Sequence, residues 1–297
     1  MFAVVAVAAQ APPLPEASGL LRVSFISLTL VVATLWVSGV YWSALRAGIA
    51  RDAARTQAVT ATGAAALWLA VTGALAASGV LRFASPPTML PVFPAVIATA
   101  IVIALSPVGG RLAMSLPLAA LIGFQSFRIA VELLLHRAYT EGLMPVQMSY
   151  SGRNLDIVTG ITAVAVALWL GRGRRSSRVV FAWNTVGVLL LLNILIVALL
   201  SAPTPMRVFM NEPANIWVTR APWVWLPTVL VLAAVMGHAL VYRRLWLERT
   251  VSARRASSGA AAATGFDEPL RLSEIVAHTA LEQRRDDRVD VSQRVHG

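Results

Sequence analysis

Seven long apolar stretches dominate this chain, and most of them have the roughly 20 residues that a helix needs to cross the hydrocarbon layer of a membrane. They cover residues 23–42, 58–80, 89–105, 112–135, 155–170, 179–200 and 221–241. Of the 297 residues, 57% are hydrophobic and only 13% are charged, which is more apolar surface than a soluble core can bury. We therefore predict an all-α fold, a polytopic transmembrane bundle of seven helices over residues 20–245.

The two ends of the chain differ from the bundle in composition. Residues 1–19 form an apolar lead-in without the basic start of a secretory signal, and we predict that they lie outside the membrane. Residues 246–297 are basic and polar, which predicts a largely flexible cytoplasmic tail. Within this tail, residues 268–285 have the spacing of an amphipathic helix, which would lie on the membrane or on a cytoplasmic partner. A tail without structure is the alternative.

Arginine placement predicts the orientation, because cytoplasmic loops are enriched in positive charge. Thirteen arginines flank one side of the predicted spans and six flank the other. The chain should therefore begin outside and end in the cytoplasm, in the inner membrane of a bacterium. The formal charge of +11 suits this topology, so nucleic acid is not an expected partner, whereas membrane lipid is.

Two missing residue types exclude several kinds of chemistry. Without cysteine there is no disulfide, thiolate metal site or cysteine nucleophile. Without lysine, a seven-helix bundle cannot hold retinal as a Schiff base. The sequence also has no phosphate-binding glycine loop and no serine-hydrolase elbow, and it implies no particular cofactor.

Polar residues inside apolar helices are the main functional candidates, because they are costly in a bilayer. In the fourth predicted helix, Arg128, Glu132 and His136 are four residues apart and so share one face, with Gln125 close to the same stripe. The stripe is expected to run from the middle of the membrane to its outer surface.

Two external loops bring further polar groups to the same end. The predicted ligand-binding set is Gln125, Arg128, Glu132, His136, Gln147, Asn154, Asp156 and Arg220, of which Glu132, His136 and Asp156 are the candidates for catalysis. We expect these residues to surround a polar cavity that opens outward and has an aromatic rim.

Other interpretations of the stripe remain open. Arg128 and Glu132 could form a buried i,i+4 ion pair that only stabilises the bundle, although such pairs contribute little net stability. Glu132, His136 and Asp156 could hold a metal, but one histidine makes this a weak signal and we predict no metal site. His238 is expected near the inner face, hydrogen-bonded beside Asn184, and too far away to share a metal with His136.

Three segments resemble a family of uncharacterised bacterial multi-pass membrane proteins. They are Phe127-Arg-Ile-Ala-Val-Glu-Leu-Leu-Leu-His136, Pro145-Val-Gln-Met148 with Gly152-Arg-Asn-Leu-Asp156, and Pro222-Trp-Val-Trp-Leu-Pro227 with His238. The resemblance covers the fourth to seventh predicted helices and implies no activity, so no catalytic role is carried over from it.

The sequence therefore leaves three functional hypotheses. The first is a protein that binds or transports a small polar or anionic amphiphile in the outward-facing cavity. The second is an intramembrane enzyme acting on a lipid or isoprenoid-like substrate, with Glu132 or Asp156 as general base and His136 as general acid. The third is a structural or assembly protein whose basic tail engages anionic lipid or a cytoplasmic partner.

Overall fold

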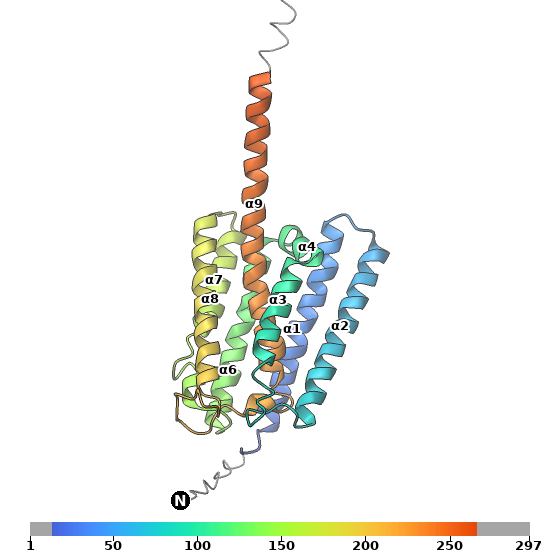
Figure 1. Cartoon of the computed structure of the whole chain (residues 1–297). Coiled ribbons are helices and arrows are strands. Elements are labelled where there is room, and N and C mark those ends of the chain that lie inside the picture. Colours follow the sequence, from blue (N-terminus) through green and yellow to red (C-terminus); the bar gives the residue numbers. More distant parts are fainter. Residues whose placement is uncertain (1–13, 266–297) are drawn as a thin grey trace, which may run out of the picture. The chain divides into compact units, whose positions relative to one another are not determined.

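The computed structural model describes residues 14–265, and this part of the chain is helical throughout its regular elements. The chain forms two units, residues 1–245 and 246–297. The helices of the first unit run alongside one another as a bundle (Figure 1). In order, the elements are α1 (Gly19–Arg46), α2 (Arg51–Ala77), α3 (Val92–Leu105), α4 (Pro107–Ser115), α5 (Leu118–Gly123), η1 (Phe124–Ser126), α6 (Phe127–Thr140), η2 (Val146–Met148), α7 (Ile157–Gly171), α8 (Ser177–Leu200), η3 (Trp217–Thr219), η4 (Leu226–Leu230) and α9 (Val231–Gly265).

Each of the seven predicted apolar stretches contains a helix, but the helices differ in their ability to span a membrane. Five helical segments of the described chain are long and apolar enough to cross: 19–46, 51–77, 118–140, 177–200 and 226–253. A sixth span results if α3 and α4 count as one, although they meet at an angle of 66°. The helix α7 has 15 residues, or about 22 Å, which is shorter than the hydrocarbon core of about 30 Å. These helices indicate a multi-pass membrane protein, and seven spans remain a prediction.

Local sequence explains where the helices begin and bend. The hydroxyls of Ser18, Ser106 and Ser176 accept hydrogen bonds from the first-turn amides of α1, α4 and α8. Ser106 and Pro107 together end α3 and begin α4, since proline is accepted at the first helical position but not inside a helix. Pro117 precedes α5, so it breaks the predicted fourth helix near its start.

The last helix is much longer than the sequence pattern predicted. We expected it to end near residue 241, whereas α9 continues to Gly265. The extension is rich in alanine, which has the highest helix propensity of all residues. The predicted amphipathic helix at 268–285 and most of the predicted lead-in, residues 1–13, lie outside the described residues.

The arginine-rich connections lie at one end of the bundle. Figure 1 places the α1–α2 connection, the α3–α4 break and the α7–α8 connection at the end opposite the start of α1. Arg46, Arg51, Arg172, Arg174 and Arg175 are exposed there. This distribution is the one expected for a membrane protein with a cytoplasmic, basic side.

Candidate functional site

The predicted stripe on α6 divides into a buried part and a surface part. Arg128 and Glu132 are each only 2% exposed, so both side chains lie within the bundle. His136, one turn further on, is half-buried; its ring stacks on Tyr150 and its Nδ1 lies 3.2 Å from Ser151 Oγ. Two members of the predicted stripe, Arg128 and Glu132, are therefore buried, and His136 does not contact either of them.

Arg128 pairs with Asp156 and not with Glu132. Its Nε donates to Asp156 Oδ2 over 2.6 Å, and its Nη2 also contacts that oxygen. Asp156 immediately precedes the first residue of α7 and accepts a weaker hydrogen bond from Thr159. The alternative interpretation, an i,i+4 ion pair between Arg128 and Glu132, is therefore wrong; the pair instead links α6 to the loop that leads into α7.

Glu132 is bound by Asn154. The Asn154 amide nitrogen lies 2.8 and 2.7 Å from the two carboxyl oxygens of Glu132 and also donates to the carbonyl of Met148. The Asn154 side-chain oxygen accepts from the backbone N–H of Asp156 over 3.1 Å. Asn154 therefore joins the Glu132 carboxyl to the Arg128–Asp156 pair.

A tight turn places Asn154 and Asp156 in this arrangement. Gly152 lies so close to the Val146 carbonyl and the Gln147 backbone that a Cβ atom would overlap with them. Only glycine fits such an approach without movement of the backbone.

His238 on α9 completes the cluster. Asn184 Nδ2 donates to the backbone carbonyl of His238, so its Oδ1, 2.8 Å from His238 Nδ1, accepts a hydrogen bond from the ring N–H. His238 Nε2 is then an acceptor, and Arg128 Nη1 lies 2.9 Å away as its donor. The predicted contact of His238 with Asn184 is confirmed, and the contact with Arg128 was not predicted.

The remaining predicted site residues lie apart from this cluster. Gln125 is buried and donates to the carbonyl of Ala234. Gln147 donates to Ser201 Oγ and accepts from Asn211. Arg220 is exposed.

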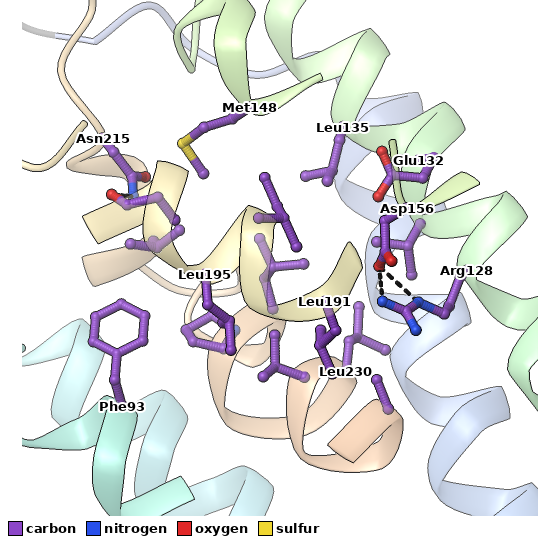
Figure 2. Close-up of a pocket in the computed structure, with 18 of the residues that line it drawn as sticks. Phe93, Arg128, Glu132, Leu135, Met148, Asp156, Leu191, Leu195, Asn215 and Leu230 are labelled. Carbon is purple, nitrogen blue, oxygen red and sulfur yellow. Dashed lines mark hydrogen bonds and ion pairs between the residues drawn. The ribbon is translucent and has the colours of Figure 1, made fainter. Parts of the chain in front are cut away.

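The cluster forms one wall of a cavity of about 60 Å³. Figure 2 shows Arg128, Glu132 and Asp156 together on one side of it, with Leu191, Leu195 and Leu230 among the lining side chains. Asn215 lines the opposite side (Figure 2); its Oδ1 is buried and has no hydrogen-bond partner within residues 14–265. The predicted polar, aromatic-rimmed cavity is thus mainly aliphatic, with polar groups on two sides.

A larger apolar cavity adjoins the first. It measures about 360 Å³ and lies between α3, α8 and the beginning of the last helix. Phe93, Leu195, Pro227 and Val231 line both cavities. The two cavities therefore share part of their walls, and the buried charges border the smaller one.

A metal is not indicated by the described residues. Within 14–265, no three histidine, aspartate or glutamate side chains are grouped so that they could hold one. Glu132 and Asp156 belong to the buried cluster, and His136 lies outside it.

Sequence reasoning missed three members of the site. His238 and Asn184 were treated as a separate pair, and Asn215 was only one of several polar loop residues. The signal available for the first two was their position as polar residues within apolar helices, which is the same signal that selected Arg128 and Glu132.

Several helices of the described chain are long and apolar enough to span a bilayer, which indicates a polytopic helical membrane protein. The buried ionic cluster lies among them. The chain belongs to the family described as "Domain of unknown function (DUF8737)", whose model matches residues 85–246, more than half of the chain. No curated protein and no solved structure matches it. The family match contains every residue of the cluster.

Proposed function

We propose that this protein binds an amphiphile whose polar head group donates hydrogen bonds to Glu132 and whose apolar part fills the adjoining cavities. The observation that carries the proposal is the position of the Glu132 carboxyl, a buried acceptor at the end of an otherwise aliphatic cavity. Binding sites for small molecules commonly combine mostly apolar walls with a few placed polar groups.

The hydrogen bonding of Glu132 supports a donor head group. A carboxylate can accept about four hydrogen bonds, and within residues 14–265 Glu132 receives them from the single nitrogen Asn154 Nδ2. A ligand hydroxyl or ammonium would satisfy the remaining lone pairs. Asn215 Oδ1, on the far side of the cavity, is a second acceptor without a partner in the described chain.

An anionic head group suits the cluster less well. Arg128 is the cation that would bind it, yet its Nε and Nη2 contact Asp156 and its Nη1 contacts His238. An anion would have to displace Asp156 and leave that carboxylate buried without its ion pair, which is costly.

The cavity dimensions fit a small head and a larger tail. The cavity of about 60 Å³ beside the cluster has room for a small polar group, and the 360 Å³ cavity next to it is almost entirely apolar. Since four residues line both, one molecule could occupy the two together.

The experiment is native mass spectrometry of the detergent-purified protein and its Glu132→Gln variant. Loss of one hydrogen bond costs about 0.5–1.5 kcal/mol, or about 2- to 13-fold in Kd, and glutamine also replaces one acceptor oxygen with a donor. The variant should therefore retain less of a molecule that the wild type binds. Glu16→Gln, at an exposed position, is the matched control and should retain it. A wild type without any bound amphiphile, or equal occupancy in Glu132→Gln, would contradict the proposal.

An intramembrane enzyme acting on a lipid is the second candidate. Glu132 lines the cavity and is linked through Asn154, Asp156 and Arg128 to His238, so a proton taken from a substrate hydroxyl would enter a connected polar cluster. Chemical change of the retained molecule during incubation, absent in Glu132→Gln, would favour catalysis; recovery of the molecule unchanged would favour binding or transport.

We also propose that the protein lies in the inner membrane with its N-terminus outside and its C-terminus in the cytoplasm. The supporting observation is the exposed arginine-rich end of the bundle. A fluorescent protein fused after residue 297 should fold and fluoresce in the cytoplasm, whereas alkaline phosphatase fused there should be inactive. The reverse result would invert the topology.

A further inference from the structure

A third cavity lies on another side of the bundle, between α1, α2, the α3–α4 pair and the last helix. It measures about 480 Å³ and shares no lining residue with the two cavities near Glu132. The hydroxyls of Thr99, Ser106 and Thr228 in its walls donate to carbonyls of their own helical segments. The lining is therefore apolar in effect, and the volume is within the range of about 300–1,000 Å³ that is usual for ligand sites.

One polar atom among the lining residues lacks a partner. The indole Nε1 of Trp36 on α1 is buried and has no hydrogen-bond acceptor within residues 14–265. A buried donor without an acceptor costs about 1–3 kcal/mol in general. This nitrogen is enclosed by protein atoms, so the surface that the cavity presents to an occupant is almost entirely apolar.

Arg111 lies next in sequence to a residue that lines this cavity, but does not line it itself. It is one residue before Leu112, which lines the cavity, and its Nη2 donates over 2.8 Å to Gln57 on α2, one turn before the lining residue Ala61. The Nε of Arg111 is buried and unpartnered in the described part of the chain. A partly satisfied guanidinium is thus placed between α2 and α4, beside the apolar walls.

A second arginine, Arg243, stabilises the break between α3 and α4. Its Nη1 donates to the backbone carbonyls of Ala104 and Ser106, at the end of α3, over 2.5 and 2.6 Å. Exposed Arg46, Arg51 and Arg55 flank the α1–α2 connection nearby, where Asp52 is the sole acid.

We propose that this cavity seats an acyl chain of an anionic phospholipid from the surrounding bilayer, with the lipid phosphate at Arg111. Charge complementarity selects this occupant: the walls take hydrocarbon, the end beside them is basic, and clusters of arginine near a membrane surface attract anionic lipid.

The test uses native mass spectrometry of protein equilibrated with vesicles of equal parts phosphatidylglycerol and phosphatidylcholine. The wild type should retain phosphatidylglycerol in preference to phosphatidylcholine. Arg111→Gln should reduce this preference about fivefold, as expected for one arginine at the membrane surface. Arg175→Gln removes an exposed arginine from the α7–α8 connection at the same end, and should leave the preference unchanged.

A second pair of variants tests the apolar part. Ala65→Phe, on the lining face of α2, should reduce retention of both lipids, whereas Ala66→Phe, exposed on the same helix, should not. Circular dichroism checks that each variant is folded. The proposal is overturned if Arg111→Gln and Arg175→Gln keep the same lipid preference, if Ala65→Phe retains as much lipid as Ala66→Phe, or if the cavity is instead covered by a lipid-free dimer that Ala65→Phe dissociates.

Discussion

Arg128 and Asp156, 28 positions apart in the chain, form an ion pair with side chains only 2% and 8% exposed. The pair connects α6 to the residue that precedes α7. With 15 residues, α7 is shorter than the hydrocarbon core of a bilayer, so contacts with other helices are needed to fix its position. The polar contacts of Glu132 and His238 both depend on the position of these two residues. The pair is therefore the centre of the cluster.

Removal of one member of this pair should destabilise the protein strongly. Arg128→Met and Asp156→Asn each leave a buried charge without its partner, for which the expected loss is about 3–5 kcal/mol in the free energy of unfolding. The double variant Arg128→Met/Asp156→Asn should lose less than the sum of the single losses. Thermal unfolding in detergent measures all three.

The exposed pair Arg55–Asp52 is the matched control. Its side chains are 69% and 97% exposed and its N–O distance is 3.6 Å. Solvent screening should limit the effect of Arg55→Met to at most about 1 kcal/mol. Equal, small losses at both pairs would show that the Arg128–Asp156 pair does not hold the bundle together.

Gly187 on α8 is required by the close approach of His238. A Cβ atom at this position would collide with the imidazole ring, so Gly187→Ala must displace His238 from Arg128 or from Asn184. We expect a loss of about 1–3 kcal/mol, typical of overpacking, together with weaker retention of any ligand at Glu132.

Gly63→Ala is the control for Gly187→Ala, because it makes the same substitution in a helix at a position without a close neighbour. Gly63 lies within α2, and a Cβ atom added there would have no other heavy atom within 4 Å, so alanine should be neutral or stabilising by up to about 1 kcal/mol. Similar unfolding temperatures for the two alanine variants would mean that His238 can move away from Gly187 at no cost.

The sequence was sufficient to predict the helices and the importance of Arg128 and Glu132, because apolar length and isolated buried charge are local signals. It was not sufficient to predict which residues they contact. The partners of Arg128 and Glu132 come from a loop whose path depends on the turn at Gly152, which no periodic pattern encodes.

The contact between His238 and Arg128 was missed for a related reason. The two residues are 110 positions apart on different helices, and a sequence pattern does not show how α6 and α9 pack against each other. The third predicted helix ends at residue 105, as α3 does, but the short helix α4 that follows the break was not predicted.

The Glu141 carboxyl, just beyond α6, should make stability depend on pH. Partial burial raises its pKa, but hydrogen bonds from the Ser18 N–H and hydroxyl and from Arg137 together outweigh this effect, so the pKa lies below its ordinary value of 4.5. A carboxyl with a lower pKa in the folded state stabilises the fold above its unfolded pKa, and this contribution is lost as the pH falls through the folded value.

Glu141→Gln should therefore lower the unfolding temperature at pH 7, and the difference from the wild type should shrink as the pH falls below 4.5. Ser18→Ala should show a smaller pH-dependent change of the same sign, because it removes the hydroxyl contact with Glu141. It also removes the hydrogen bond from the Leu21 N–H at the start of α1, which adds a loss that does not depend on pH. An unfolding-temperature difference between wild type and Glu141→Gln that stays constant over this range would contradict the assignment.

Leu195 offers the sharpest test of whether one molecule occupies both cavities near the cluster. It lines each of them, so the larger side chain of Leu195→Trp should reduce the space in both. If a single amphiphile binds, Leu195→Trp and Glu132→Gln should both lose the same molecule, and the double variant should be no worse than the more damaging single variant. Leu189→Trp, at a position of α8 that is 58% exposed, should retain the molecule.

Two separate occupants would behave differently under the same variants. Glu132→Gln would then affect only a small polar molecule near the cluster, and Leu195→Trp would displace only an apolar molecule from the larger cavity. Mass spectrometry distinguishes the cases because the lost masses are the same in the first and different in the second. Since four residues line both cavities and Glu132 lines the smaller one, we expect the first result.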